Sequence, residues 1–214
     1  MAYKVMLVED DQLMRLSLEA AFREIGFDVA VSAENAASAL RQAKSTNLDA
    51  AVIDLHLGTG PNGIDLGNAL RQLNPQLGIT FLTSYDDPRL LDSNIKKIPI
   101  GSKYITKREV SSVKELSEVV ISCILNPRLD AAPKTSLVSQ LTSIQIETLK
   151  LVAMGLTNSE ISSRRFITQK SVELTISRVA KSLGIPNDGS KNQRVLVAKA
   201  FFESIGGNTP IETK

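Results

Sequence analysis

The sequence Leu48-Asp49-Ala50-Ala51-Val52-Ile53-Asp54 contains four consecutive apolar residues between two aspartates. A short run that is apolar on both faces predicts a central strand of a parallel sheet, covered by helices on each side. Asp54 stands where this strand ends, and in open α/β sheets the ligand crevice lies outside the carboxyl ends of the strands. A second apolar run, residues 5–8, ends in the same way at Glu9-Asp10-Asp11. We therefore expect acidic side chains from two strands to meet at one edge of the sheet.

Strand and helix patterns alternate through residues 1–125. Strands are expected at residues 3–8, 27–31, 50–53, 78–83 and 103–105. Helices are expected at residues 13–25, 35–43, 64–73 and 110–125. A further helix is expected to open at Asp87-Pro88, because proline is tolerated in a first turn. This alternation predicts an α/β doubly wound, five-stranded parallel sheet with right-handed crossovers.

The ends of the expected strands carry side chains that suit one kind of chemistry. Glu9 and Asp10 follow the first strand, Asp54 the third, Thr83 ends the fourth, and Lys107 lies just past the last. Converging carboxylates repel one another, and a hard divalent cation such as Mg²⁺ relieves that repulsion through oxygen ligands. Beside such a cation, Asp54 is an ionised oxygen nucleophile able to form an aspartyl phosphate. The hydroxyl of Thr83 and the ammonium of Lys107 could then surround the phosphoryl oxygens.

The same residues resemble the receiver domain of two-component response regulators, which has a flavodoxin-like fold. Tyr104 and the Leu13-Met14-Arg15 sequence after the acidic pair add to this resemblance. The resemblance implies that Asp54 is the phosphoacceptor and that a sensor histidine kinase donates the phosphoryl group. Arg108 and Gly58 depart from the pattern, since each stands where that family commonly has proline.

The resemblance also assigns roles to the other residues at the strand ends. Four ligands are implied for Mg²⁺: Glu9, Asp10, Asp54 and the backbone carbonyl of His56. Two residues are implied to bind the phosphoryl group: Thr83 and Lys107. Tyr104 would be the aromatic switch whose rotamer follows the position of Thr83.

Residues 142–204 show only helical patterns. Two capping boxes, Thr142-Ser143-Ile144-Gln145 and Thr157-Asn158-Ser159-Glu160, mark the starts of the first two helices. Thr168 is expected to cap a third helix that stops at Gly184, and a fourth spans residues 193–202. A short helix, a turn and a longer capped helix predict a small all-α, four-helix domain of the helix-turn-helix type.

The third helix has two distinct faces at a period of 3.6 residues. One face forms the expected core stripe, with Val172, Ile176, Val179 and Leu183. The opposite face carries Lys170, Leu174, Ser177 and Lys181. Its lysines could reach phosphates or guanine edges, and Leu174 could touch a thymine methyl group.

Four stretches of this part are similar to the LuxR/NarL-type DNA-binding domain: residues 141–145, residues 155–161, Ser171-Val172 and Leu183-Gly184-Ile185. The resemblance implies that the third helix recognises promoter DNA and that the fourth mediates a homodimer in the active state. The residues implied at the DNA are Lys170, Ser171, Glu173, Leu174, Ser177, Arg178 and Lys181. Those implied at the dimer contact are Ala198, Phe201 and Phe202. Glu173 departs from the family, which commonly has a basic residue there, and Ser177 is not basic.

Composition limits the class of protein. The chain has 214 residues, of which 43% are hydrophobic and 22% charged, and this leaves room for two modest domains. Its single cysteine, Cys123, excludes an intrachain disulfide, and its single histidine argues against a Ser-His triad. No apolar run has the length of a membrane span or a secretory signal, so no membrane contact and a cytoplasmic setting are expected.

Charge divides unevenly along the chain. Residues 1–125 carry 13 Lys and Arg against 16 Asp and Glu, whereas residues 137–204 carry 9 against 5. The basic part is therefore the candidate for meeting phosphates. The expected organisation is a receiver at 1–125, a linker at 126–139, a helix-turn-helix domain at 140–206 and a tail at 207–214.

Together these patterns predict a response regulator in which phosphorylation by a histidine kinase controls sequence-specific DNA binding and transcription. Such a protein accepts one phosphoryl group and is not a turnover enzyme beyond self-dephosphorylation. One alternative is a receiver-controlled, protein-interaction regulator whose helical domain does not bind DNA. Another is a phosphatase-like hydrolase, but such enzymes usually carry a second aspartate two residues after the nucleophile, where this chain has His56.

Overall fold

The computed structural model describes residues 2–92, 95–128, 136–186, 189 and 191–207. The chain divides into two compact units. The first contains residues 1–83 and 95–133, and the second contains residues 84–94 and 134–214. Among the described residues, no helix is both long enough and apolar enough to cross a bilayer.

The first unit is built on a five-stranded parallel sheet, as the alternating pattern predicted. Its strands are β1 (Lys4–Val8), β2 (Asp28–Ala33), β3 (Ala50–Ile53), β4 (Gly78–Thr83) and β5 (Lys103–Thr106), in the order β2-β1-β3-β4-β5. The apolar strand β3 lies at the centre and pairs with β1 and β4 on its two sides. All four of its residues are buried, which explains why its sequence is apolar on both faces.

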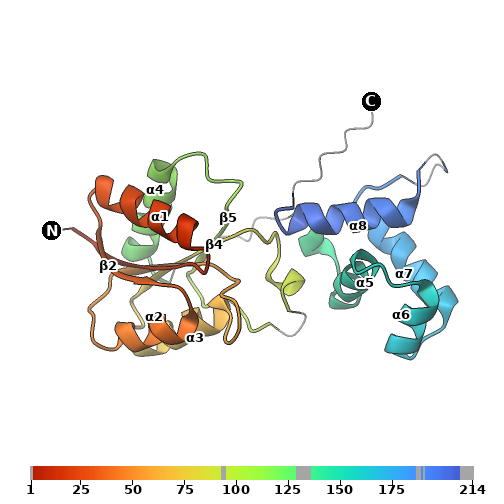
Figure 1. Cartoon of the computed structure of the whole chain (residues 1–214), viewed down its shortest axis with the longest axis horizontal. Helices are drawn as coiled ribbons and strands as arrows, with labels where there is room; N and C mark the ends of the chain where they lie inside the picture. Colours follow the sequence, from red (N-terminus) through yellow and green to blue (C-terminus); the bar gives the residue numbers. More distant parts are fainter. Residues whose placement is uncertain (1, 93–94, 129–135, 187–188, 190, 208–214) are drawn as a thin grey trace. The chain divides into compact units, whose positions relative to one another are not determined.

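Helices cover both faces of this sheet. Helices α1 (Gln12–Glu24) and α4 (Val113–Leu125) lie on one face, and α2 (Ala36–Ala43) and α3 (Gly63–Leu73) on the other (Figure 1). Each begins at a side-chain N-cap, provided by Asp11, Asn35, Asn62 and Ser112. The doubly wound fold expected from the sequence is therefore confirmed.

One element of the first 125 residues differs from expectation. The segment that opens at Asp87-Pro88 forms only the 3₁₀ turn η1 (Pro88–Leu90), and the described residues between β4 and β5 contain no α-helix. Residues 84–92 group with the second unit. The reason is that their apolar and polar groups find partners among the helices of that unit. The predicted domain boundaries stay predictions, and residues 129–135 of the linker and 208–214 of the tail lie outside the described residues.

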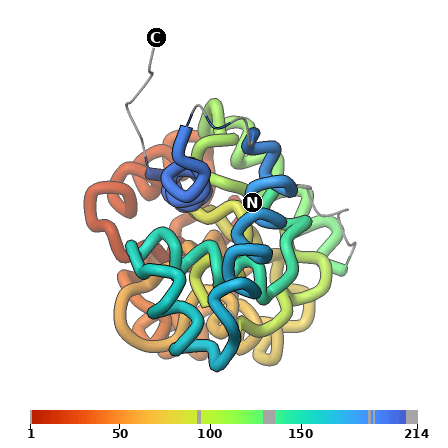
Figure 2. The backbone as a smooth tube through the Cα atoms, turned by 90° about the vertical axis from the view of Figure 1, so that its right-hand side faces the viewer, coloured from red at the N-terminus to blue at the C-terminus, as the bar shows by residue number. Residues whose placement is uncertain are grey.

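The second unit is helical. It contains α5 (Ser143–Ala153), α6 (Asn158–Arg165), α7 (Gln169–Ser182) and α8 (Gln193–Ser204), with a short 3₁₀ turn η2 (Val138–Gln140) before α5. Figure 2 shows α8 almost end-on, and α8 packs against both α5 and α7. Both predicted capping boxes are present, at the starts of α5 and α6. The core of this unit is a single apolar cluster that includes Leu149, Ile161, Val172 and Val197.

Candidate functional site

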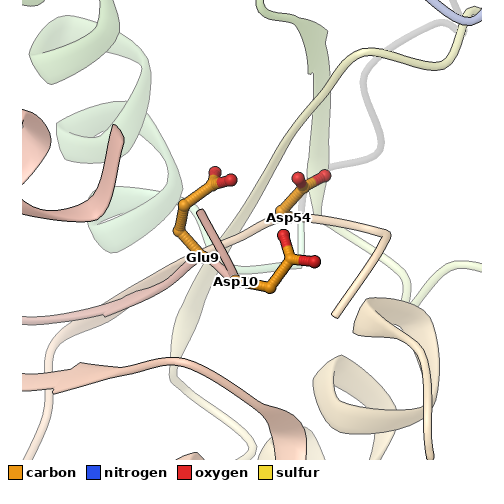
Figure 3. A group of neighbouring side chains, drawn as sticks. All are labelled: Glu9, Asp10 and Asp54. Atoms are coloured by element: carbon orange, nitrogen blue, oxygen red, sulfur yellow. The ribbon is translucent and has the colours of Figure 1, made fainter. Parts of the chain in front are cut away.

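Two neighbouring strands of the first unit bring three carboxylates together. Glu9 and Asp10 follow β1, and Asp54 follows β3, whose Ile53 pairs with Val8. The amide of Asp54 donates to the backbone oxygen of Val8 at 2.9 Å, so the ladder continues to the start of the site. One carboxylate oxygen from each acid lies within 4.8 Å of the others (Figure 3). The predicted meeting of these three acids is therefore observed, with Glu9 and Asp54 buried and Asp10 exposed.

Lys107 enters the same site from beyond β5. Its Nζ lies 2.7 Å from Oε2 of Glu9 and 2.9 Å from Oδ2 of Asp54. Its backbone amide donates to the oxygen of Thr83 at 2.7 Å, which continues the pairing of β4 with β5 by one residue. Because this backbone bond fixes where Lys107 leaves the strand, its ammonium reaches the acids although Arg108 stands in place of proline.

The electrostatics of the site reflect burial and charge together. Burial raises the pKa of the Glu9 carboxyl above its ordinary value, and the negative charge of Asp54 adds to this, while the hydrogen bond from Lys107 opposes it. Burial alone would lower the pKa of Lys107, but the charge of Asp54 and hydrogen bonds to Glu9 and Asp54 outweigh it, so that pKa is raised. Lys107 is therefore held in its charged form by the two acids that it contacts.

The donor set fits a divalent cation. Three carboxylates and one ammonium leave a formal excess of two negative charges when all are ionised. Asp54 Oδ1 is buried and has no hydrogen-bond partner among the described residues, whereas Oδ2 is occupied by Lys107. A buried oxygen without a partner is costly unless a ligand or water satisfies it. Oxygen ligands of this kind are those that Mg²⁺ prefers, with water completing its shell.

Two residues that support the site were not assigned a role from the sequence. Arg15 donates from Nη1 to the backbone oxygen of Glu9 at 2.6 Å and so fixes the turn that carries the acids. Gly63, the first residue of α3, lies so close that a Cβ built there would overlap the backbone oxygen of Asp54. A glycine at the start of the helix that follows a strand-end aspartate is the sequence feature that could have indicated this close approach.

The remaining predicted residues of this site lie at the same edge of the sheet or next to it. Thr83 ends β4 and is fully buried, and Tyr104 is half-buried in β5, where it pairs with Phe81. The side chain of His56 is exposed. The phosphoryl-binding, switch and carbonyl-ligand roles of these residues stay predictions.

Helix α7 of the second unit has the two faces that its sequence predicted. Val172, Ile176 and Val179 are buried in the apolar cluster, while Leu183 is half-buried. All the residues predicted to meet DNA are exposed: Lys170, Ser171, Glu173, Leu174, Ser177, Arg178 and Lys181. A helix buried along one side and exposed along the other can enter a groove of DNA.

The residues predicted at a dimer contact are placed differently from one another. Ala198 and Phe201 of α8 are half-buried and pack against the apolar cluster of their own unit. The ring of Phe202 is 41% exposed and meets Phe201 edge-on. Of these three side chains, Phe202 therefore has the most surface available for a second copy of the chain.

Comparison with known families agrees with this arrangement. Residues 5–117 match the response regulator receiver domain, and residues 139–190 match the bacterial regulatory proteins of the luxR family. The chain is a response regulator. It belongs to the group with a LuxR-type helix-turn-helix domain, and it is accordingly a DNA-binding member of the two-component systems.

This response regulator has relatives along nearly its whole length. It is 31% identical to the DNA-binding transcriptional activator DevR/DosR of Mycobacterium tuberculosis over 85% of this chain and 88% of that protein. It is 25% identical to the nitrate/nitrite response regulator protein homolog of Haemophilus influenzae over 94% of this chain and 96% of that protein. A solved structure of the response regulator RcsB with DNA is similar in fold, with a TM-score of 0.58, 16% identity and coverage of 96% of this chain and 100% of that one.

Proposed function

We propose that Asp54 of this response regulator accepts a phosphoryl group from a sensor histidine kinase, and that this controls binding of α7 to promoter DNA. The observation that carries the proposal is the unequal environment of the two Asp54 oxygens. Lys107 holds Oδ2 at 2.9 Å, and buried Oδ1 has no partner among the described residues. Lys107 thus holds the carboxylate in one orientation and leaves Oδ1 available to a ligand.

The reaction is a transfer from nitrogen to oxygen. An oxygen of Asp54 attacks the phosphorus of a phosphohistidine, the P–N bond breaks, and its electron pair stays on the imidazole nitrogen. Lys107 and the Thr83 hydroxyl bind the phosphoryl oxygens and stabilise the charge on them. Mg²⁺, when bound, supplies further positive charge, and we assign its ligands to Glu9, Asp10, Asp54 and the His56 carbonyl. Turnover is limited to loss of phosphate from Asp54 to water.

DNA binding is assigned to the exposed face of α7. Lys170, Arg178 and Lys181 supply cations for phosphates or guanine edges. Exposed Glu173 opposes phosphate contact unless it accepts a hydrogen bond from a cytosine amine. We propose a homodimer of the phosphorylated form, because a two-fold protein reads two half-sites. A cytoplasmic setting suits the buried free thiol of Cys123.

Phosphate transfer is tested with acetyl phosphate and Mg²⁺, followed by a phosphate-affinity gel and mass spectrometry of the modified peptide. We expect modification of the wild type and of Asp28→Asn, which removes an exposed acid on β2, but none of Asp54→Asn. A wild-type chain that takes no phosphate, or an Asp54→Asn chain that is still modified, would refute the assignment.

DNA recognition is tested by selecting bound duplexes from a random-sequence pool, with and without acetyl phosphate. We expect enrichment of one sequence and a binding constant that falls steeply with salt. Recovery of unenriched duplexes without a salt dependence would instead favour a protein-interaction regulator.

A further inference from the structure

The segment that follows β4 is part of the folded core of the helical unit. Leu90 is 3% exposed and lies in the same apolar cluster as Leu149 and Val197. Tyr85 packs against that cluster as well. The turn η1 lies against α5, where Figure 1 shows it in yellow-green. Truncation of Leu90 would therefore leave a cavity among the helices of the second unit.

Polar contacts fix the same segment to the residues that precede α5. Arg89 donates to the backbone oxygen of Leu141 at 2.8 Å and to that of Ser139 at 3.1 Å. Asp87 holds the Arg89 guanidinium through two bonds of 2.9 Å, so its direction is set within the segment itself. Because Asp87 already orients the Arg89 guanidinium, its bonds to the two carbonyls cost little additional side-chain conformational entropy.

The beginning of the segment lies against the C-terminal end of α8. The amide of Asp86 donates to the backbone oxygen of Ser204 at 2.8 Å. A Cβ built on Gly206 would lie 2.9 Å from the Cβ of Ser84. Ser84 is the residue directly after Thr83, which is fully buried at the end of β4. Only two residues therefore separate Thr83 from the backbone bond to α8.

We propose that residues 84–92 are the coupling element of this response regulator, through which a change at Thr83 alters the position of the C-terminal end of α8. This inference rests on the proposed function, in which Thr83 binds the phosphoryl group. A displacement of Thr83 is either taken up by Ser84 and Tyr85 or passed to Asp86, because only these two residues lie between Thr83 and Asp86. The closeness of Gly206 to Ser84 limits how far Ser84 can adjust. Coupling of this kind is reciprocal, so a change at α8 also alters the response to phosphorylation.

Two glycines of the second unit provide a matched pair of variants. Gly206 and Gly155 both follow the end of a helix, and both have a φ of +81°. Alanine at either site incurs a similar backbone strain, but a Cβ at Gly155 meets nothing within 4 Å, whereas one at Gly206 meets Ser84. Only Gly206→Ala should therefore disturb the coupling element.

The test measures the affinity of the full chain for the duplex selected above, with and without acetyl phosphate, together with the fraction phosphorylated. We expect the ratio of the two affinities to fall by about fivefold or more in Gly206→Ala and to stay at the wild-type value in Gly155→Ala, since coupling of this size is common. Both variants should take up phosphate as the wild type does. The inference would be overturned if the affinity ratio in Gly206→Ala were unchanged or if it fell equally in both variants. A wild-type affinity ratio of one would overturn it as well. If the wild type takes up no phosphate, the phosphate-affinity gel shows that the proposed function has failed, and this outcome is thereby distinguished from a failure of the coupling element.

A second measurement does not depend on phosphorylation. Hydrogen exchange of the peptide covering residues 84–92 is compared in two full-length core variants, Leu149→Ala in the helical unit and Leu116→Ala in the sheet unit, where both leucines are buried. We expect exchange of this peptide to accelerate by roughly tenfold or more in Leu149→Ala and to change little in Leu116→Ala. The opposite pattern would show that the segment unfolds with the sheet, and the inference would be wrong.

If Leu149→Ala does not fold, Leu90→Ala replaces it. In that variant, hydrogen exchange is measured in α5 and α1 rather than in residues 84–92. Faster exchange in α5 alone supports the inference, and faster exchange in α1 alone contradicts it.

Discussion

Lys107 donates to both carboxylate oxygens of Glu9, at 2.9 Å to Oε1 and 2.7 Å to Oε2. Its ammonium, which also lies 2.9 Å from Oδ2 of Asp54, therefore offsets negative charge of these acids. A divalent cation must share these oxygens with Lys107, so the two cations repel each other across a short distance.

We expect Lys107→Met to bind Mg²⁺ more tightly than the wild type, by roughly tenfold, because the competing charge is gone. The same variant should take up phosphate from acetyl phosphate more slowly, since one of the groups that bind the phosphoryl oxygens is missing. Isothermal titration with Mg²⁺ and a phosphorylation time course measure the two effects separately. Lys44→Met, which removes a charge at the end of α2, is the control. Weaker Mg²⁺ binding in Lys107→Met would show that the ammonium organises the acids rather than competing with a cation.

Gly63 makes a second prediction about the same site. A side chain there would overlap the backbone oxygen of Asp54, and the next nearest atoms are also backbone atoms, of Asp54 and Leu55, so there is little room for adjustment. We expect Gly63→Ala to destabilise the first unit by about 1–3 kcal/mol, as overpacking does, and to slow phosphorylation by displacing Asp54. Calorimetry and the phosphorylation time course measure both.

Gly58→Ala is the matched control for this effect. Gly58 has a φ of +70° and nothing within 4 Å of a built Cβ, so alanine there strains the backbone without pushing Asp54. It should lower stability by about 1 kcal/mol and leave the phosphorylation rate nearly unchanged. Equal phosphorylation rates in Gly63→Ala and the wild type would mean that α3 moves away as a body.

Local signals explain most of what the sequence predicted correctly. The strands were recognisable because buried parallel strands are apolar on both faces, and helix starts were recognisable because capping uses neighbouring residues. Thr168 caps α7 and Asn35 caps α2 as expected, through bonds to amides three residues away. The position of Asp54 followed from the same rule, since a residue after a parallel strand must lie at the carboxyl edge.

Contacts between distant residues explain what could not be predicted. The sequence placed Lys107 and Glu9 at the same edge of the sheet, but it did not predict the direct bond between these side chains, which are 98 residues apart. Arg89 finds its backbone partners about fifty residues later, at Ser139 and Leu141. A local pattern at Asp87-Pro88 therefore predicted a helix start, but tertiary partners held the segment in one short turn.

The N-terminus of α6 makes stability depend on pH. The backbone amide and then the hydroxyl of Thr157 donate to the Glu160 carboxylate and hold the pKa of Glu160 below its ordinary value. A carboxyl whose pKa is lowered on folding stabilises the fold above its unfolded pKa, and this stabilisation is lost as pH falls through the folded value. We expect the wild type to melt at a higher temperature than Glu160→Gln at neutral pH, and the difference to disappear in acid. Calorimetry at neutral and acid pH measures it.

The capping box of α5 provides the control, since glutamine already stands at its third position. Gln145 accepts from the Thr142 amide at 2.8 Å, and its amide group does not titrate in this range. We expect Gln145→Glu to acquire the acid-sensitive stabilisation that Glu160→Gln loses. A melting difference that does not vary with pH in either variant would show that these exposed carboxylates add nothing beyond a neutral hydrogen bond.

The lysines on α7 make a prediction about salt dependence. If Lys170 and Lys181 contact phosphates, each change to alanine should weaken binding to all duplexes alike and lower the slope of log affinity against log salt by about 1. Lys199→Ala is the control, because Lys199 lies on α8, 3.6 Å from the carboxylate of Glu203. Fluorescence anisotropy over a range of salt concentrations measures the slopes. A slope equal to that of the wild type in Lys170→Ala or Lys181→Ala would place that residue away from the phosphates.

Glu173 should act on sequence preference rather than on charge alone. An exposed carboxylate on the face of α7 repels phosphates, so Glu173→Gln should tighten binding to random duplexes. If the same carboxylate accepts from a cytosine amine, glutamine should also reduce the preference for the selected duplex by about tenfold, the magnitude of one specific base contact. Binding of selected and random duplexes by one variant separates the two effects. A preference that survives Glu173→Gln unchanged would mean that this acid is tolerated at the DNA surface and reads no base.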